Sequence, residues 1–486
     1  MKIENKTRKT ASCTRILIMW SLGIIVSAFL MSACTGGGKA KSGNSLEIGI
    51  AEVNYTPAIG LKLVGNYRGD DYASRGVHDS LYAKALVASD GKGQKVAVLT
   101  IDICLIPAES VEFMRSCISS QTDIKPENVM IMATHSHSGP PAGLDDPKAK
   151  EYLARAAGAV ILANNRLKPT VLAVGRSKED RISHNRRLKC KDGSTHMCWE
   201  KFEPGFVLEP WGSIDPEVIT MSFEQEGKQT GVLVNFGCHA TTMTGNNWLY
   251  TADYPGYLAE AVKRVRGKDF VSLFCNGCCG NVTQVDYRIG FPDTYQECQR
   301  IGYLLGVSAL EAMQNEKVVT GNEIAVSREM VPLSRIDITD EQLAWANAIM
   351  KKVEKEGMPP IQADGIPDAQ YAKDWIEMRK NQNVTDSVEV MVIRIGDVAF
   401  AGLPGDMFNE FGRDIKAKSP CRNTIVTGLT NDERAYFPTA VSFTQGLSGF
   451  TPMITGYETT PGSTLYEIGS GEKLAESAVN QLNRIF

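Results

Sequence analysis

The chain of 486 residues lacks the motifs of several common enzyme classes. There is no G-x-S-x-G motif, which argues against a serine enzyme of the α/β-hydrolase type. There is no H-E-x-x-H motif, which argues against the common zinc-protease class. A G-x-G-x-x-G fingerprint is missing wherever a nucleotide-binding strand and helix would need it. Histidine is also scarce, with six in the whole chain.

Strong charge imbalance and internal repeats are absent as well. The formal net charge is −4 and no long basic run follows the first residues, so we expect no nucleic-acid partner. No segment beyond the N-terminal region is long and apolar enough to span a bilayer. The apolar content of 43% and the charged content of 22% are typical of a packed globular protein.

The N-terminal region has the features of an export signal. Basic residues precede the apolar segment 16–31, and Ser32, Ala33 and Cys34 follow it. The sequence "MSAC" resembles a bacterial lipobox, in which the cysteine is lipidated after cleavage, and ordinary cleavage to a free secreted protein is the alternative. We therefore predict a lipoprotein signal peptide over 1–33 and a flexible tether over 34–45. The exported protein would be anchored to the bacterial cell envelope through a lipid on Cys34, at the outer membrane or facing the periplasm.

Twelve cysteines are present, and ten remain outside the signal region. Export permits disulfide bonds. Cys190 and Cys198 would close a short loop, but the sequence leaves the pairing open.

From about residue 46 onward, strand-like and helix-like segments alternate. Residues 95–106 are apolar and β-rich, residues 108–121 have helical spacing, and 128–135 is strand-like again. This pattern predicts an α/β fold of mixed β-sheets flanked by helices. No linker rich in proline, glycine or serine divides residues 46–486, so we expect one large domain. A separate helix is predicted over 339–357, because Thr339 and Gln342 form a capping-box pattern.

Three apolar strands end in residues that can bind a metal. His135 and His137 end the segment "NVMIMATHSHSGP" (128–140), and their spacing places both on one side of a strand. His239 follows the strand in "GVLVNFGCH", and Asp406 follows the strand in "VAFAGLPGD". Sites in open α/β folds form at strand carboxyl ends, and imidazoles with one carboxylate are typical of a catalytic zinc site.

The residues alone leave alternatives open. The His-x-His pair is a weak signal by itself. Asp406 can be a helix N-terminal charge, and Glu410, one turn later, can compete as the carboxylate. The loop "CNGCCGN" (275–281) contains a Cys-x-x-Cys pattern that can be a redox or zinc motif, although no second cysteine pair follows. We expect its glycines instead to permit close approach of the backbone to a ligand.

The segment "ATHSHSGP" resembles the "ATHTHSGP" signature of the neutral/alkaline non-lysosomal ceramidases. Further similar segments follow in the family's order over residues 46–470: "RGVHDSLYAKALV" (75–87), "LTIDICLI", "SHNRR" (183–187), "NFGCHATTM", "GCCGNVTQ" (277–284), "LPGDMFNEFGRDIK" (403–416), "AYFPT" (435–439) and "GYETTPGSTLY" (456–466). Each motif is short, and it is their ordered combination that is specific. The resemblance implies a layered α/β sandwich, without the β-sandwich domain that longer relatives carry.

The resemblance also assigns roles residue by residue. It implies zinc ligands at His135, His239, Asp406 and Tyr436. It places His137 beside the zinc-bound water, and it places Thr283, Arg186 and Tyr457 around the scissile amide. Without the resemblance, these last three and Tyr436 can be ordinary packed or surface residues. Four positions depart from the family pattern: aspartate replaces glutamate at 406, threonine replaces serine at 283, and Gln284 and Val285 replace Pro-Asn.

The predicted function is zinc-dependent hydrolysis of an amphiphilic N-acyl lipid, similar to N-acylsphingosine, to a fatty acid and an amine. His137 would handle protons, and Asp102 and Asp253 can orient the ligating imidazoles, with helix capping or a buried turn as the alternative. His78 and His184 are further candidates for the site wall. The alternatives are a hydrolase of the same fold acting on another amide or ester, and a non-catalytic surface lipoprotein that binds a ligand.

Overall fold

The computed structural model describes residues 46–68, 73–358 and 366–486. The predicted signal peptide and tether, including Cys34, lie outside the described residues. Residues Asn44–Phe486 cluster as one compact unit. Within the described ranges, no helix is both long enough and apolar enough to cross a membrane.

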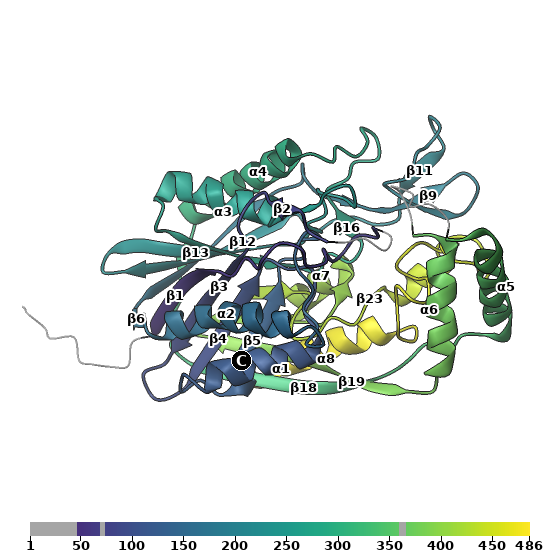
Figure 1. Cartoon of the computed structure of the whole chain (residues 1–486). Coiled ribbons are helices and arrows are strands. Elements are labelled where there is room, and N and C mark those ends of the chain that lie inside the picture. Colours follow the sequence, from purple (N-terminus) through teal and green to yellow (C-terminus); the bar gives the residue numbers. More distant parts are fainter. Residues whose placement is uncertain (1–45, 69–72, 359–365) are drawn as a thin grey trace, which may run out of the picture. The chain divides into compact units, whose positions relative to one another are not determined.

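The first of three main sheets has the strand order β5-β4-β3-β1-β6 (Figure 1). Its strands are β1 (Glu47–Asn54), β3 (Tyr82–Ser89), β4 (Lys95–Ile101), β5 (Val129–Ala133) and β6 (Lys168–Pro169). Strands β3 and β4 pair antiparallel, whereas β4 and β5 pair parallel and are connected through α1 (Ala108–Ser119). Helix α2 (Pro147–Asn164) packs beside α1 on the same face of this sheet.

The other two main sheets repeat this arrangement of an antiparallel hairpin followed by a parallel crossover. The second sheet has the strand order β15-β13-β12-β7-β17. Its strands are β7 (Val171–Lys178), β12 (Glu217–Gln225), β13 (Lys228–Phe236), β15 (Val271–Asn276) and β17 (Lys317–Val318). The third sheet has the strand order β18-β19-β20-β22. Its strands are β18 (Ile324–Ser334), β19 (Thr385–Ile395), β20 (Val398–Gly402) and β22 (Asn423–Thr427). Their crossover helices are α3 (Asp253–Arg266) and α7 (Asn409–Lys418), accompanied by α4 (Tyr295–Gln314) and α8 (Ser470–Ile485).

One apolar core is shared by all three sheets, and each sheet has a second core beneath its own helices. On β19, Met391 and Ile393 belong to the shared core, whereas Val390 and Val392 pack with residues of α7 and α8. A strand that is buried on both faces has a continuous apolar sequence, which explains the apolar strand-like segments seen in the sequence. The predicted α/β fold of mixed sheets flanked by helices is confirmed.

Two helices lie apart from the three sheets, at the right of Figure 1. They are α5 (Asp340–Glu356) and α6 (Asp368–Lys380), and they share a small core around Trp375. The predicted capping box is present: the Thr339 hydroxyl accepts from the Gln342 backbone N–H, and the Gln342 side chain accepts from the Thr339 N–H. Gly357 ends α5, as its position in the sequence indicates.

Short ladders and 3-10 turns complete the fold. They comprise β2 (Gly76–Val77), β14 (Leu249–Tyr250), β8 (His184–Asn185), β16 (Val282–Thr283), β9 (Arg187–Cys190), β10 (Thr195–Met197), β11 (Val207–Pro210), β21 (Asp406–Met407), β23 (Tyr436–Phe437), η1 (Pro126–Asn128) and η2 (Ala440–Thr444). The ten cysteines of the described part are all free thiols, so Cys190 and Cys198 form no disulfide.

A buried ion cluster ties α1 to the third sheet. Arg115 donates to both carboxylate oxygens of Glu389 at 3.0 and 2.8 Å, and also to the carbonyl of Val129 at the start of β5. Arg328 of β18 contacts the same carboxylate. Burial alone would raise the pKa of Glu389, but these two guanidinium groups hold it below its ordinary value.

We predict that Arg115→Ala lowers the free energy of unfolding by about 3 kcal/mol, because it leaves the buried Glu389 carboxylate short of a partner. Chemical denaturation followed by circular dichroism measures this loss. Arg155→Ala, at an exposed position of α2, is the control and should cost less than about 0.5 kcal/mol. Equal losses in the two variants would mean that the cluster does not brace the sheets.

Candidate metal centre and active site

Three donor atoms from three different strand ends converge in the interior. His135 follows β5, His239 follows β13, and Asp406 lies in β21 just after β20. The Oδ1 atom of Asp406 is 3.4 Å from Nε2 of His135 and 3.5 Å from Nε2 of His239. All three side chains are buried, and their donor atoms lie within 4.8 Å of one another. The structure therefore brings together the three residues that the strand ends predicted as metal ligands.

Backbone carbonyls orient both imidazoles. Nδ1 of His135 is 2.8 Å from the carbonyl of Cys104, and Nδ1 of His239 is 2.8 and 3.0 Å from the carbonyls of Cys279 and Val282. A carbonyl only accepts, so Nδ1 carries the proton in each ring and Nε2 offers a lone pair. His135 also has a φ angle of 73°, in the left-handed region where a non-glycine residue is strained.

Asp102 and Asp253, the two carboxylates considered for orienting the imidazoles, accept hydrogen bonds from backbone N–H groups instead. Asp102 accepts a hydrogen bond from the backbone N–H of Tyr82, at 2.9 Å. Asp253 accepts from the N–H groups of Met243 and Tyr254 at the start of α3. Asp102 and Asp253 therefore fit the alternative of a helix cap or a buried turn. Backbone carbonyls, and not these carboxylates, lie beside the ligating imidazoles.

The donor set fits a divalent metal ion. Oδ1 of Asp406 is buried and has no hydrogen-bond partner, which is costly unless a cation or donor meets it. Burial, followed by the charge of Arg186, holds the pKa of His239 well below its ordinary value, so the ring is neutral as a ligand must be. Imidazole nitrogens and one carboxylate oxygen are a common set for catalytic zinc.

Tyr436, the predicted fourth ligand, lies against this group. Strands β21 and β23 pair in parallel and place Tyr436 directly opposite Asp406. The Tyr436 hydroxyl is 3.1 Å from Nε2 of His239, and the two rings are stacked. Nη1 of Arg186 is 3.2 Å from the same nitrogen, so a metal ion bound there would displace this contact.

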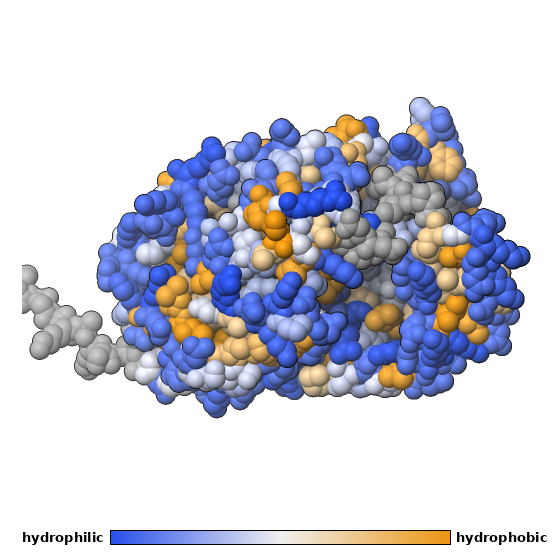
Figure 2. Space-filling model, in the orientation of Figure 1, coloured by the Kyte–Doolittle hydropathy of each residue, from blue (hydrophilic) through white to orange (hydrophobic). Residues whose placement is uncertain are grey.

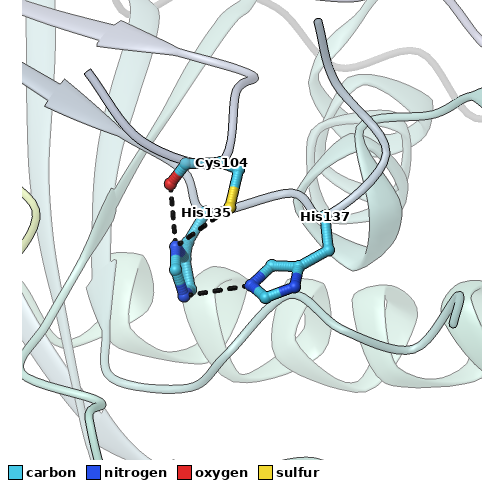
Figure 3. Close-up of side chains that lie close together, drawn as sticks. All are labelled: Cys104, His135 and His137. Carbon is cyan, nitrogen blue, oxygen red and sulfur yellow. Dashed lines mark hydrogen bonds between the residues drawn. The ribbon is translucent and has the colours of Figure 1, made fainter. Parts of the chain in front are cut away.

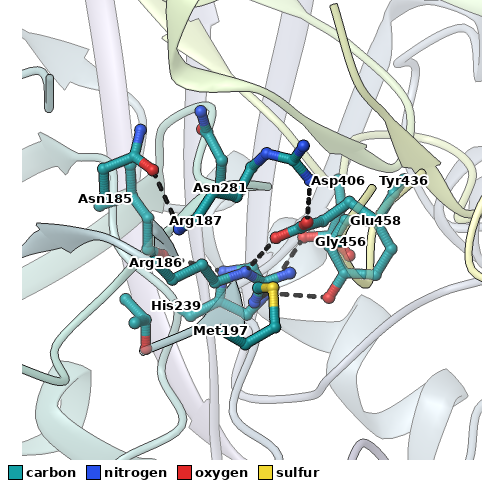
Figure 4. A network of polar contacts seen from close by, with 12 residues as sticks. Asn185, Arg186, Arg187, Met197, His239, Asn281, Asp406, Tyr436, Gly456 and Glu458 are labelled. Carbon is teal, nitrogen blue, oxygen red and sulfur yellow. Dashed lines mark hydrogen bonds and ion pairs between the residues drawn. The ribbon is translucent and has the colours of Figure 1, made fainter. Parts of the chain in front are cut away.

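Arg186 is buried among aromatic rings and acidic groups (Figure 4). Its guanidinium carbon lies 5.0 Å from the ring centre of Tyr436, 5.4 Å from Trp199 and 5.7 Å from Tyr457. Its Nε atom donates to Glu458 at 2.6 Å, whereas its buried Nη2 atom has no partner. Arg186 is therefore not the ordinary surface residue that the sequence alone permitted.

A cavity of about 380 Å³ opens beside these residues. Six of the eight predicted site residues line it: His137, Arg186, His239, Thr283, Tyr436 and Tyr457. Aromatic and apolar side chains such as Trp248, Phe291, Ile366, Tyr371 and Met453 form much of the remaining wall. A cavity with apolar walls and a few convergent polar groups is typical of a small-molecule site.

Residues 46–300 match the family model described as neutral/alkaline non-lysosomal ceramidase, N-terminal. This chain belongs to that family. It is 25% identical over 300 residues to the neutral ceramidase of Pseudomonas aeruginosa, a match that covers 57% of this chain and 43% of that relative's length. The chain therefore spans less than half of this curated relative.

Solved ceramidase structures share the fold. The crystal structure of neutral ceramidase from Pseudomonas aeruginosa superposes with a TM-score of 0.67 at 20% identity, covering 90% of this chain and 74% of that one. A ceramidase complexed with C2 gives a TM-score of 0.68 at 18% identity, covering 90% and 75%. These likenesses extend the ceramidase fold beyond the matched N-terminal segment.

In this ceramidase-family site, His137 lies on the cavity side of His135. The Nε2 atoms of the two rings are 3.2 Å apart (Figure 3). Burial and the neighbouring charges hold the pKa of His137 well below its ordinary value, so the ring is neutral. Cys104, which the sequence argument missed, forms a second candidate metal-binding group with these two histidines. Its position at the carboxyl end of β4, beside β5, was the available signal.

Thr283 lies in the cavity wall as the ceramidase resemblance predicts, but its hydroxyl is already engaged. It donates to Oε1 of Gln284 at 2.8 Å, and the hydroxyl of Thr241 donates to the same oxygen at 3.1 Å. The Thr283 proton can stabilise an oxyanion only if the hydroxyl turns away from Gln284. Gln284 is one of the positions where this chain departs from the family pattern.

Other candidates lie elsewhere. Glu410 bonds to Asn281 and is outside the group of metal donors found in the described chain. His78 stacks on Tyr295, and neither His78 nor His184 is among the residues that line the cavity. Asp406 precedes α7 by three residues and is not its N-cap.

The Cys-x-x-Cys loop is structural. Cys275 and Cys278 are buried free thiols, and neither belongs to a candidate metal group in the described ranges. A Cβ atom on Gly280 would lie 2.3 Å from the carbonyl oxygen of Asp406. The close backbone approach at Gly280 is therefore to the strand that carries Asp406.

We predict that chelator-treated protein takes up one Zn²⁺ per chain and that His239→Ala does not. Loss of an orienting partner alone weakens metal binding by about 10–100-fold, so loss of a ligand should exceed that. Mass spectrometry of metal content after dialysis measures uptake. His78→Ala, which removes a histidine outside the cavity wall, is the control. Full zinc content in His239→Ala would exclude this residue as a ligand.

Proposed function

We propose that this protein is a zinc-dependent amidohydrolase that cleaves an N-acyl amide, releasing a fatty acid and an amine. The supporting observation is the convergence of His135, His239 and Asp406, with one unpartnered carboxylate oxygen, beside an apolar-walled cavity in a chain of the ceramidase family. His135, His239, Asp406 and Tyr436 are the proposed zinc ligands. A zinc ion held there would act as a Lewis acid and lower the pKa of a water molecule.

His137 is the proposed proton carrier. Its neutral, buried imidazole lies beside the metal group and lines the cavity, so it can reach both a water molecule and the bound amide. Water adds to the amide carbon while His137 takes its proton, and the same proton passes to the leaving nitrogen as the carbon–nitrogen bond breaks. The products are a carboxylic acid and an amine, with no net gain or loss of protons at the histidine.

Arg186 and Tyr457 are the proposed binding groups for the amide oxygen. The unpartnered Nη2 of Arg186 is buried beside the cavity, where a charged donor is effective against developing negative charge. Tyr457 stands at the ring edge of Tyr436, with ring centres 5.3 Å apart, and its hydroxyl is protonated because burial raises its pKa. Thr283 completes this set if its hydroxyl rotates toward the substrate.

An amphiphilic N-acyl lipid similar to N-acylsphingosine is the proposed substrate. The aromatic and apolar part of the wall suits an acyl chain, and His137, Arg186 and His239 place polar groups in the same cavity. A hydrolase of the same fold acting on a different amide or ester is the second candidate. The hydrogen bonds from Thr241 and Thr283 to Gln284 favour it, because they differ from the arrangement that the family pattern implies.

For localisation, we propose export and anchorage to the bacterial cell envelope through a lipid on Cys34. The support is the sequence alone: a basic start, the apolar segment 16–31 and the following "MSAC". A lipid anchor would keep the enzyme near an amphiphilic substrate.

A substrate panel distinguishes the two candidates. The purified protein should release fatty acid from N-acylsphingosine faster than from N-acyl amino acids or from fatty-acid esters of equal chain length. Chromatographic measurement of the released fatty acid gives kcat/KM for each compound. Faster turnover of an ester or of another amide would favour the second candidate, and no turnover of any compound would contradict the proposal.

We predict that His137→Gln lowers kcat by about 10²–10⁴-fold, because glutamine cannot carry the proton. Zinc content should stay unchanged, since His137 is not a proposed ligand. His196→Gln is the control and should keep full activity, because His196 bonds to Asp192 and Glu200 outside the cavity. An unaltered kcat in His137→Gln would remove this residue from the mechanism.

A further inference from the structure

A single buried carboxylate joins the two arginines of the "SHNRR" segment (Figure 4). Oε1 of Glu458 is 2.6 Å from Nε of Arg186, and Oε2 is 2.7 Å from Nη1 of Arg187. Glu458 has an exposed fraction of 0%, and both arginines are buried. Burial alone would raise the pKa of Glu458, but the two guanidinium groups hold it below its ordinary value, so the bridge is ionic.

Arg187 anchors this bridge to the chain segment that forms part of the cavity wall. Its Nη2 atom donates to the carbonyls of Ser442 and Thr455, at 3.1 and 2.7 Å. It also contacts Oε1 of Gln445, at 3.2 Å. Arg187 thus ties Glu458 to fixed backbone and leaves it little freedom to move.

Arg186 depends on Glu458 for its orientation. Within the described structure, Glu458 is the only carboxylate that forms an ion pair with it. The Tyr436 hydroxyl also interacts with the guanidinium, but the charge-assisted bond from Nε to Glu458 is the stronger directional contact and fixes the plane of the guanidinium. With that plane fixed, Nη1 points at His239 and Nη2 is left unpartnered beside the cavity.

We propose that Glu458 is a positioning residue, which acts through Arg186 to hold the unpartnered Nη2 where the amide oxygen of the substrate binds. This inference rests on the proposed function, because it assigns to Arg186 the binding of that oxygen. Nothing in the sequence pattern separates Glu458 from an exposed loop glutamate.

A second buried glutamate provides a matched control. Glu389 also bridges two arginines, Arg115 and Arg328, but it lies on β19 of the third sheet and does not line the cavity. Glu458→Gln and Glu389→Gln therefore remove the same charge from the same kind of bridge. Both should lower the thermal stability, and only the first should change the kinetics.

The test is a double-mutant cycle on N-acyl amide hydrolysis, using Glu458→Gln, Arg186→Ala and the double variant. We expect Glu458→Gln to lower kcat/KM by roughly 10–100-fold, mostly through kcat, because glutamine removes the charge and offers one acceptor oxygen to two arginines, which weakens the bond to Arg186. The double variant should match Arg186→Ala within about 2-fold, since Glu458 acts through Arg186. Wild-type kinetics in Glu458→Gln, or losses that multiply in the double variant, would overturn the proposal.

Glu458→Asp distinguishes positioning from packing, and it serves also if Glu458→Gln fails to fold. Aspartate keeps the charge but is one methylene shorter, so it should recover part of the activity that glutamine loses. A packing role predicts the opposite order, because aspartate leaves a gap and glutamine does not. Zinc content should remain stoichiometric in both variants, and metal loss in either would overturn the proposal.

A crystal structure of Glu458→Gln keeps the two proposals separate. If the wild-type protein hydrolyses no N-acyl amide, the proposed function fails. The crystal structure of the variant still shows where Arg186 lies. The inference predicts that the Arg186 guanidinium is displaced or rotated relative to its position in the wild-type protein crystallised with the same zinc content. A guanidinium that stays in place would overturn the inference whatever the activity.

Discussion

The site depends on a carboxylate that the fold buries without satisfying it. One oxygen of Asp406 has no hydrogen-bond partner, and the Nε2 atoms of His135 and His239 face it at 3.4 and 3.5 Å. Burial without a hydrogen-bond partner disfavours the charged form of a carboxylate, and it raises the pKa of Asp406 above its ordinary value. A divalent cation held there, as proposed for this site, would compensate the buried carboxylate. The surrounding carbonyls, ion pairs and loops serve to keep these three groups together.

The repeated topology explains how residues so distant in sequence meet. Each main sheet contains an antiparallel hairpin followed by a parallel crossover, and each delivers one of the proposed metal ligands from a strand end. The loops beyond the strands are then joined directly: the N–H of His137 donates to Ala240, and that of Gly280 to Met407. Because the sheets share one apolar core, the position of the site is set by packing across the whole domain.

The sequence predicted those parts of the site that follow strict local rules. Strand ends located His135, His239 and Asp406, and the ceramidase resemblance located Arg186 and Tyr436, all of which the structure brings together. Their roles in catalysis stay predictions. Cys104 and Glu458 were missed because loop segments have no periodicity from which burial can be read. Asp102 and Asp253 were considered as orienting groups because sequence patterns reveal side chains, whereas the groups that actually orient the imidazoles are backbone carbonyls.

The most direct test of the central claim is anomalous diffraction from zinc-loaded crystals of the protein. The account predicts one strong peak at the zinc edge, within coordination distance of Nε2 of His135, Nε2 of His239 and the carboxylate of Asp406, about 2.0–2.2 Å from each. A peak centred on other residues, or no peak in crystals grown from stoichiometrically loaded protein, would contradict it.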